Sequence, residues 1–180
     1  MCRSARADRA GRIAAALLLL LASAGCANRT APIAERFAPT PPFDVAAFFS
    51  GRTTGEGVLD IALRDPEPVR VEGRGQLLVD GTLVLEQVVA RGDRPLDRRR
   101  WRIRQVAPDR WRGYLSDATD LVDAQVTGNR LTIRYPMRGG LIATQHLHLQ
   151  PDGRTALNRM TITKLGIAVG TLEETIRKVD

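Results

Sequence analysis

From residue 43 onward, apolar and polar side chains alternate along most of the chain, and short turn sequences interrupt the alternation. A period of two places successive side chains on opposite faces of a β-strand. Glycine, proline, aspartate and asparagine mark the turns, as in Asp65-Pro66, Asp80-Gly81 and Gly128-Asn129. The pattern therefore predicts an all-β fold with strands at 52–63, 67–79, 82–91, 97–106, 110–118, 121–126, 129–137, 141–150, 156–165 and 167–178.

Two segments depart from this pattern. Residues 43–50 (FDVAAFFS) favour one or two helical turns ahead of the first strand. Residues 171–178 suit either a helix or a strand, because Leu172 and Ile176 lie on one side of both. No long helix and no internal repeat is visible in the sequence. About eight to ten short antiparallel strands in one domain are typical of a closed up-and-down barrel or of a β-sandwich.

The N-terminal segment has the composition of an export signal. Four arginines precede an unbroken apolar run from Ile13 to Ala24, and small residues follow it. These are the parts of a secretory signal peptide. Twelve helical residues span about 18 Å, short of the roughly 30 Å hydrocarbon core of a bilayer. The sequence therefore predicts a signal peptide over residues 1–25 and no permanent transmembrane helix.

Two cleavage sites are compatible with this signal. Residues 22–24 (ASA) suit ordinary signal peptidase, whereas Ser23-Ala24-Gly25-Cys26 resembles the lipobox of bacterial lipoproteins. A lone cysteine directly behind an apolar run favours the second site, with Cys26 acylated and holding the protein to a membrane. The alternative is a soluble secreted protein with a free thiol. By resemblance to Gram-negative lipoproteins, Ala27 favours the outer membrane, with the protein facing the periplasm.

The remaining chain divides into a tether and one domain. Residues 26–42 contain four prolines and little periodicity, which predicts an extended, flexible tether. Residues 43–180 contain all the predicted strands and form the β-barrel domain.

Composition and charge exclude several classes of protein. With 43% hydrophobic and 26% charged residues, the chain is neither disordered nor a multi-span membrane protein. Its two cysteines, Cys2 and Cys26, exclude a disulfide scaffold and a multi-cysteine metal site. The formal charge of the whole chain is +7. Removal of the signal peptide takes away four arginines and one aspartate and leaves about +4. Nucleic acid is therefore not an expected partner of this exported protein.

Six arginines form the most conspicuous charged pattern. Alternation places four of them on one face of a strand, with Trp101 and Ile103 on the other face, and two more follow around Trp111. We interpret this face as solvated and balanced by nearby aspartates such as Asp93, Asp97 and Asp117. The alternative is a patch for anionic lipid headgroups, since guanidinium binds phosphate in a bidentate way. The six are Arg98, Arg100, Arg102, Arg104, Arg110 and Arg112.

Candidate ligand-binding residues are a carboxylate and several aromatic side chains. Glu86 lies between Val84 and Val88 on one strand face. If that face lines a barrel, a buried carboxylate needs a partner or a raised pKa, and it would either orient a ligand or pair with an inward arginine. Aromatic residues at alternating positions are candidates for lining a pocket, although such residues usually belong to the core. They are Trp101, Trp111, Tyr114 and Tyr135.

His146 and His148 are two residues apart and share one strand face. Such a pair is half of a zinc or copper site, but no third ligand follows from the spacing, so we favour a solvated polar face and predict no metal or cofactor. The sequence contains no nucleophile elbow, phosphate loop, dinucleotide fingerprint or metalloprotease helix motif. We therefore expect a protein that is not an enzyme.

A set of short motifs occurs in a fixed order along the domain. The motifs are residues 48–51 (FFSG), 55–57 (GEG), Glu86, Arg100-Trp101, Tyr114, 118–122 (ATDLV), Gly128-Asn129, Tyr135, 157–160 (LNRM), 164–166 (KLG) and Gly170. This ordered set resembles domain-of-unknown-function family 3833, a family of uncharacterised bacterial proteins often described as lipoproteins, over residues 43–178. The resemblance implies a lipocalin-like barrel and a location in the cell envelope. The chain departs from the expected pattern at residues 145–148 (QHLH), where the family is expected to have an Asp-Asp-Trp-like element.

These observations predict an exported, monomeric lipoprotein whose barrel binds a hydrophobic ligand such as a fatty acid or a lipid, because small barrels enclose apolar cavities. The alternative is a non-catalytic envelope scaffold that docks partner proteins through a barrel edge or the arginine face.

Overall fold

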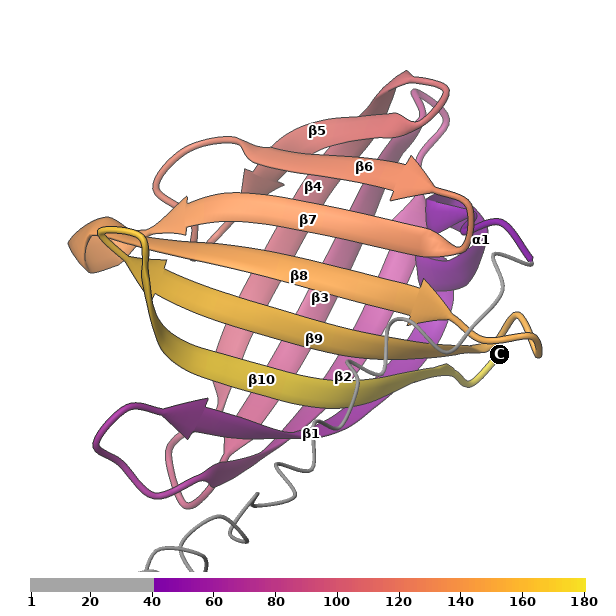
Figure 1. Ribbon diagram of the computed structural model, residues 1–180. Coiled ribbons are helices and arrows are strands. Elements are labelled where there is room, and N and C mark those ends of the chain that lie inside the picture. The colour runs from indigo at the N-terminus through magenta and orange to yellow at the C-terminus, as the bar shows by residue number, and fades with distance from the viewer. Residues whose placement is uncertain (1–40) are drawn as a thin grey trace, which may run out of the picture. The chain divides into compact units, whose positions relative to one another are not determined.

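The computed structural model describes residues 41–180, which form an antiparallel barrel of ten strands (Figure 1). The helix α1 (Val45–Phe49) precedes the first strand, and the short 3-10 helix η2 (Arg138–Gly140) connects the seventh and eighth. The predicted signal peptide, Cys26 and most of the predicted tether lie outside the described residues. The strands are β1 (Gly51–Ile61), β2 (Glu67–Leu77), β3 (Thr82–Arg91), β4 (Asp97–Ala107), β5 (Arg110–Leu115), β6 (Val122–Thr127), β7 (Arg130–Met137), β8 (Leu141–Leu149), β9 (Thr155–Lys164) and β10 (Ile167–Lys178).

The strands follow one another around the barrel in chain order, and β1 pairs with β10 to close it. At this seam Gly55 lies opposite Ile176 and Gly57 lies opposite Glu174. The all-β prediction is confirmed, and of its two architectures the structure is the closed up-and-down barrel. Residues 171–178, which the sequence left open between helix and strand, belong to β10.

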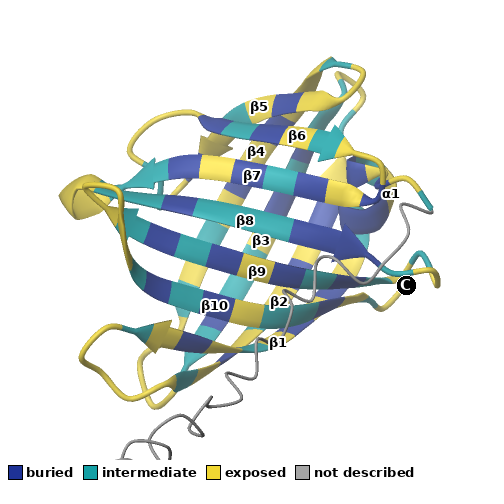
Figure 2. Ribbon diagram, viewed as in Figure 1, coloured by how far each residue is buried: buried dark blue, intermediate teal, exposed yellow. Residues whose placement is uncertain are grey.

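The core lies inside the barrel because alternate residues of each strand point inward. In β3, for example, Leu83, Leu85 and Val89 are buried inside the barrel, while Val84, Glu86 and Val88 face outward. Figure 2 shows the resulting alternation of buried and exposed positions along the strands. The side chains with the lowest exposure come from many parts of the chain and include Tyr135, Leu83, Leu131, Leu147, Val45 and Val122.

The helix α1 closes one end of the barrel. The carboxylate of Asp44 caps the helix by accepting a hydrogen bond of 2.9 Å from the Ala47 backbone amide. Phe48 and Phe49 are buried and pack edge to face with ring centroids 5.0 Å apart. The helix can approach β2 closely because residue 75 is glycine: a Cβ there would lie 1.8 Å from the carbonyl oxygen of Phe49.

The helix α1 covers one end of the barrel, whereas among the described residues only loops and a short 3-10 helix surround the other end. We name the end that carries α1 the helix end; the chain enters there, and the Phe43 amide donates to the Gly128 carbonyl oxygen across 2.9 Å. The five connections from odd- to even-numbered strands lie together at the opposite end (Figure 1). We name them the rim loops: residues 62–66, 92–96, 116–121, 138–140 and 165–166. No helix among residues 41–180 is long and apolar enough to cross a membrane.

Candidate ligand-binding site

A cavity of about 130 Å³ lies inside the barrel, and most of the side chains around it are apolar. It extends from Val45 and Phe49 of α1 to Arg91, Asp117 and Met137 near the rim loops. The volume is similar to the roughly 150 Å³ of an engineered apolar cavity that binds benzene, and below the roughly 300–1,000 Å³ of ordinary ligand pockets. The barrel therefore has room for a ring or a short chain without rearrangement.

A chain of polar side chains crosses the cavity wall from β7 to β10. The amide of Gln145 donates to the Tyr135 hydroxyl oxygen across 3.2 Å, and the Asn158 amide donates to Gln145 Oε1 across 3.2 Å. Asn158 Nδ2 also donates to Glu174 Oε2 at 2.9 Å. Asn158 Oδ1, in contrast, is buried and accepts no hydrogen bond from the described residues. A buried acceptor without a donor is unfavourable. Tyr135, Gln145 and Glu174 line the cavity, whereas Asn158 joins Gln145 to Glu174 from behind and is not among the lining residues.

Glu174 carries the carboxyl group of this wall. Burial raises the pKa of Glu174, while the hydrogen bond from Asn158 and the positive charge of Arg99 act in the opposite direction. The carboxyl fits because residue 55 of the neighbouring strand is glycine: a Cβ at Gly55 would lie 2.1 Å from Glu174 Oε1. The raised pKa stabilises the neutral carboxyl relative to that of an exposed glutamate, and the neutral form can both donate and accept a hydrogen bond.

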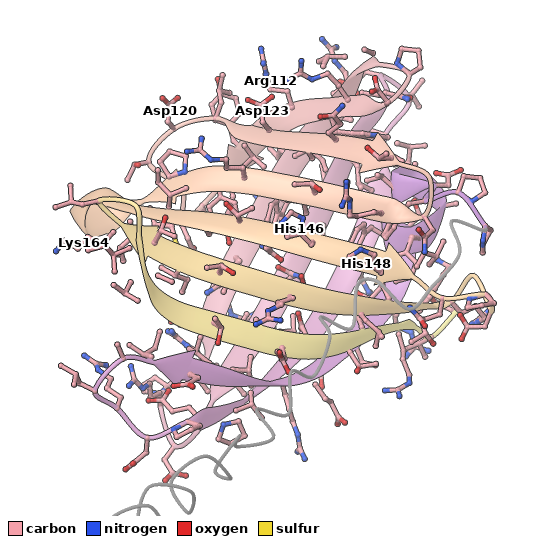
Figure 3. All side chains as sticks on the ribbon, viewed as in Figure 1. Arg112, Asp120, Asp123, His146, His148 and Lys164 are labelled. Carbon is pink, nitrogen blue, oxygen red and sulfur yellow. The ribbon has the colours of Figure 1, made fainter. Side chains whose placement is uncertain are left out.

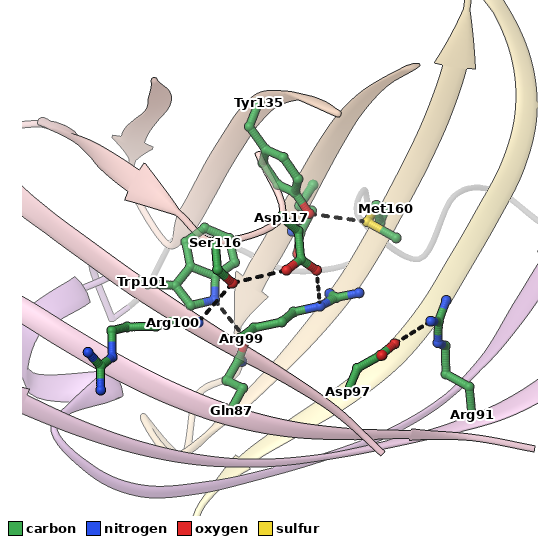
Figure 4. A network of polar contacts seen from close by, with 11 residues as sticks. Gln87, Arg91, Asp97, Arg99, Arg100, Trp101, Ser116, Asp117, Tyr135 and Met160 are labelled. Carbon is green, nitrogen blue, oxygen red and sulfur yellow. Dashed lines mark hydrogen bonds and ion pairs between the residues drawn. The ribbon is translucent and has the colours of Figure 1, made fainter. Parts of the chain in front are cut away.

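An ion pair lies where the cavity approaches the rim loops. Arg99 Nε is 2.6 Å from Asp117 Oδ2, and both side chains are only partly exposed. Ser116 donates to the other carboxylate oxygen of Asp117 at 3.0 Å (Figure 4). Despite its short distance to Asp117, Arg99 Nε makes no aligned hydrogen bond within the described residues. Arg99 is therefore an inward-facing cation whose hydrogen-bonding capacity is not fully used.

Trp101 and Tyr135 form the aromatic part of the site. Their rings meet edge to face, with centroids 5.7 Å apart. Trp101 Nε1 donates to Gln87 Oε1 at 2.7 Å, and the Tyr135 hydroxyl points toward Met160 Sδ at 3.9 Å (Figure 4). Burial raises the pKa of Tyr135, so its hydroxyl remains a neutral donor at ordinary pH.

The structure separates the predicted ligand-binding residues into three groups. Trp101 and Tyr135 line the cavity as expected. Trp111 is buried at the helix end and is not among the residues that line the cavity. The prediction that Tyr114 and Glu86 face the interior is wrong: Tyr114 is 66% exposed, and Glu86 lies on the outer wall. Both faces of β3 carry valine or leucine, so alternation alone did not show which face is inside.

Glu86 does pair with an arginine, but on the outside of the barrel. Arg100 Nη2 lies 2.5 Å from Glu86 Oε1, and both side chains are more than half exposed. An exposed pair of this kind stabilises the fold only weakly, by roughly 0–1 kcal/mol.

The six predicted stripe arginines all face outward, but the expected partners were wrong. Arg110 and Arg112 share Asp123, at 3.5 and 3.1 Å (Figure 3). Asp97 pairs with Arg91 and Asp117 with Arg99, so neither aspartate neutralises the stripe. Three stripe residues form no ion pair with any described residue: Arg98, Arg102 and Arg104.

His146 and His148 lie on the outer wall of β8 (Figure 3), but the predicted solvated face is wrong for His148, which is only 7% exposed. The Nδ1 atom of His146 is 3.1 Å from the Thr132 hydroxyl. Desolvation and the charge of Arg130 lower the pKa of both imidazoles. Among residues 41–180, no group of three or more histidine, cysteine, aspartate or glutamate side chains is arranged to hold a metal ion.

Sequence reasoning missed the polar residues that line the cavity. Arg99 shares a strand face with Trp101 and Ile103, and Glu174 shares one with Leu172 and Ile176. Glu174 stands between two apolar residues on its face, a signal that could have identified it, whereas Arg99 follows Asp97 on its own face and gave a weaker signal. Gln145 and Asn158 carried no such signal, because uncharged polar residues are common on either face of a strand.

Comparisons with known proteins agree with this fold. A family model described as "Protein of unknown function (DUF3833)" matches residues 20–178. No curated protein sequence matches the chain. The S-type phycobiliprotein lyase CPES from Guillardia theta has a similar structure, with a TM-score of 0.58 and 8% identity over 77% of this chain and 94% of the lyase.

A second similar structure is a protein of unknown function from the DUF3598 family of Nostoc punctiforme PCC 73102. It has a TM-score of 0.56 and 14% identity over 77% of this chain, which spans 50% of that protein. At these identities the likeness concerns the fold, and the predicted lipocalin-like barrel is confirmed.

Proposed function

This chain belongs to the DUF3833 family, and we propose that its barrel binds a small amphipathic ligand, such as the end of a fatty acid or of a lipid acyl chain, in the cell envelope. The observation that carries this proposal is the interior cavity of about 130 Å³, with apolar walls and one polar side. Apolar pockets with a few convergent polar groups are the usual sites of small-molecule binding.

The polar side of the cavity suits a carboxylate or another hydrogen-bonding head group. Arg99 is already paired with Asp117, and it offers a ligand its unused N–H donors rather than a free charge. The Tyr135 hydroxyl supplies a further donor whose present contact, a methionine sulfur, is weak. Burial shifts the pKa of Glu174 upward, which makes its protonation beside an anionic head group easier than for an exposed glutamate. Binding of a carboxylate therefore raises the pKa of Glu174 further and takes up a proton.

The cavity volume limits the length of the bound chain. A cavity of this size takes about six carbon atoms without rearrangement. A longer chain requires neighbouring side chains to move, and Met137 and Met160 are suited to this because methionine has three rotatable bonds. We therefore expect medium-length acyl chains to fit better than long ones.

The similar structures share the fold of this chain and carry no catalytic residue to it. One of them is a phycobiliprotein lyase, so a barrel of this shape also occurs in an enzyme. At 8% identity its reaction does not transfer, and the residues around the cavity show no nucleophile paired with a base. Our proposal is therefore a binding function.

The cellular location is part of the same proposal. We infer from the sequence that residues 1–25 are removed and that Cys26 carries acyl chains that anchor the protein to the outer membrane. Mass spectrometry of the mature N-terminus tests this directly. Acyl groups on Cys26 support the anchor, and a free thiol at Cys26 refutes it.

Ligand binding is tested with the full chain and a cavity-filling variant. Val71→Phe places a larger side chain inside the cavity, and Val84→Phe makes the same change on the outer wall of β3 as a matched control. Calorimetric titration with octanoate should show at least about a tenfold loss of affinity for Val71→Phe and less than about a twofold change for Val84→Phe. Equal affinities in all three proteins would show that octanoate does not occupy the barrel.

A further inference from the structure

Large aliphatic side chains are exposed at both ends of the barrel: Val79, Val106, Leu77 and Val179 at the helix end, and a set of leucine and isoleucine residues in and beside the rim loops. Leu63 and Leu165 are 105% and 92% exposed, and Ile167, Leu96 and Leu121 are 70%, 63% and 38% exposed. They lie in or beside four of the five rim loops, so they surround the end of the barrel (Figures 1 and 2). Single exposed leucines are ordinary, but a ring of them at one end marks an interaction surface.

The backbone at two of these leucines adds an independent observation. Leu63 and Leu165 have φ values of 65° and 50°, and within the described residues they are the only non-glycine residues with positive φ. Leucine is disfavoured in this region, which glycine occupies freely, as Gly166 does here. Because both side chains are almost fully exposed, no packing within the described chain offsets the strain. A contact outside the chain would do so.

We propose that the rim inserts its aliphatic side chains into the interface of a lipid bilayer, so that the mouth of the barrel faces the membrane. This inference rests on the proposed function, because the cavity extends to Asp117 and Met137 at the same end. An acyl chain that leaves the bilayer at the rim enters the cavity without crossing water.

The composition of the rim favours a bilayer over a protein partner. The exposed apolar residues are all leucine or isoleucine, whereas protein-binding hot spots are dominated by tryptophan, tyrosine and arginine. The loop charges alternate in sign, as in Arg64-Asp65 and Asp93-Arg94, so no single-sign patch selects a charged partner. Lys164, at the end of β9 beside the rim, has a long side chain that reaches lipid headgroups while the leucines insert (Figure 3).

The length of the N-terminal chain permits this orientation. The described chain begins at the helix end, so an anchor on Cys26 has to reach past the barrel. A strand of 11 residues, tilted as in other barrels, makes the barrel about 30 Å tall. The chain from Cys26 to Pro41 can span at most about 50 Å, which exceeds this height.

Depth measurements on the full chain in phosphatidylethanolamine–phosphatidylglycerol vesicles test the orientation. Environment-sensitive fluorophores are attached at Leu63→Cys, at Leu165→Cys and at Val79→Cys, and the labelled unsubstituted chain reports the background from other cysteines. Val79 is the matched control because it is 109% exposed in the β2–β3 turn at the helix end. Quenchers placed in the bilayer should quench the two rim probes at least several-fold more than the Val79 probe.

A second measurement separates this inference from the proposed function. The double variant Leu63→Ser, Leu165→Ser should slow transfer of a fluorescent fatty acid from vesicles by about tenfold, the effect of losing about 1.4 kcal/mol of interaction. Its affinity for octanoate in solution should stay within about twofold of the unsubstituted chain, since neither residue lines the cavity.

The outcomes separate the two proposals. Rim probes as accessible to water as the Val79 probe overturn the membrane orientation, even if octanoate binds. Rim probes that are shielded before vesicles are added indicate a protein partner and also overturn it. Rim probes that insert in a protein that binds no octanoate support the orientation and refute the proposed ligand.

Discussion

Truncation of Leu83 measures how tightly the walls of the cavity are packed. Leu83 is 1% exposed, lies on β3 and borders the cavity. Leu83→Ala removes three carbon atoms, and their lost burial alone amounts to about 2.4 kcal/mol at about 0.8 kcal/mol per methylene group. The void that remains adds roughly 24 cal/mol per Å³. With about 40 Å³ left unfilled, the free energy of unfolding falls by about 3 to 4 kcal/mol.

The same truncation enlarges the binding site. The void merges with the existing cavity of about 130 Å³, so a longer acyl chain fits. Each methylene group of ligand that becomes buried contributes about 0.8 kcal/mol, or roughly fourfold in affinity. We therefore expect decanoate to bind Leu83→Ala more tightly than octanoate does, whereas the unsubstituted chain gains little from the two added carbons.

Urea unfolding with and without ligand measures both effects. Leu77→Ala is the matched control, because Leu77 lies opposite Leu83 in the β2–β3 register but is 47% exposed. Its truncation should lower the free energy of unfolding by only about 1 kcal/mol. A loss below about 1 kcal/mol for Leu83→Ala would show that its site is not close-packed. An unchanged preference between octanoate and decanoate would show that the ligand does not reach this part of the barrel.

Four further predictions concern charge and backbone packing. Folding raises the pKa of Glu174 above 4.5, so the unfolded chain loses this proton first and the free energy of unfolding falls as the pH rises above 4.5. Glu174→Gln should remove this dependence of the free energy of unfolding on pH, which urea unfolding at a series of pH values measures. Folding lowers the pKa of His148 below 6.5, so stability falls as the pH drops below 6.5, and His148→Gln should weaken this loss in the same assay. Gly75→Ala forces the helix away from β2 and should lower the free energy of unfolding by about 1–3 kcal/mol, and an unchanged midpoint would contradict the packing of the helix on the sheet. Replacing Arg98 and Arg102 by serine should weaken association with anionic vesicles relative to neutral ones, and equal association of the unsubstituted chain with both would refute a headgroup-binding stripe.

The strands and most of their boundaries could be read from the sequence, whereas their order in the sheet could not, because the pattern suits a closed barrel and a β-sandwich alike. The alternation of apolar and polar residues marks the two faces of each strand. The residues that end a strand, such as Asp80-Gly81 and Gly128-Asn129, favour a turn through their own backbone preferences. The pattern of β4 also placed the arginine stripe correctly on an outer wall, because arginine is rarely buried without a partner. The N-terminal predictions, including the acylation of Cys26, rest on the sequence alone.

Only the tertiary structure decided which side of β3 is inside and which residues meet across the barrel. Glu86 and Tyr114 were assigned to the interior because alternation shows that two faces differ, not which of them is enclosed. The contacts among Tyr135, Gln145, Asn158 and Glu174 join four strands, and they depend on the registers that pair β7 with β8, β8 with β9 and β9 with β10. Local preferences of the chain fix strands and turns, whereas a cavity and its polar wall form only when distant segments pack, because they depend on volumes and distances that no single segment contains.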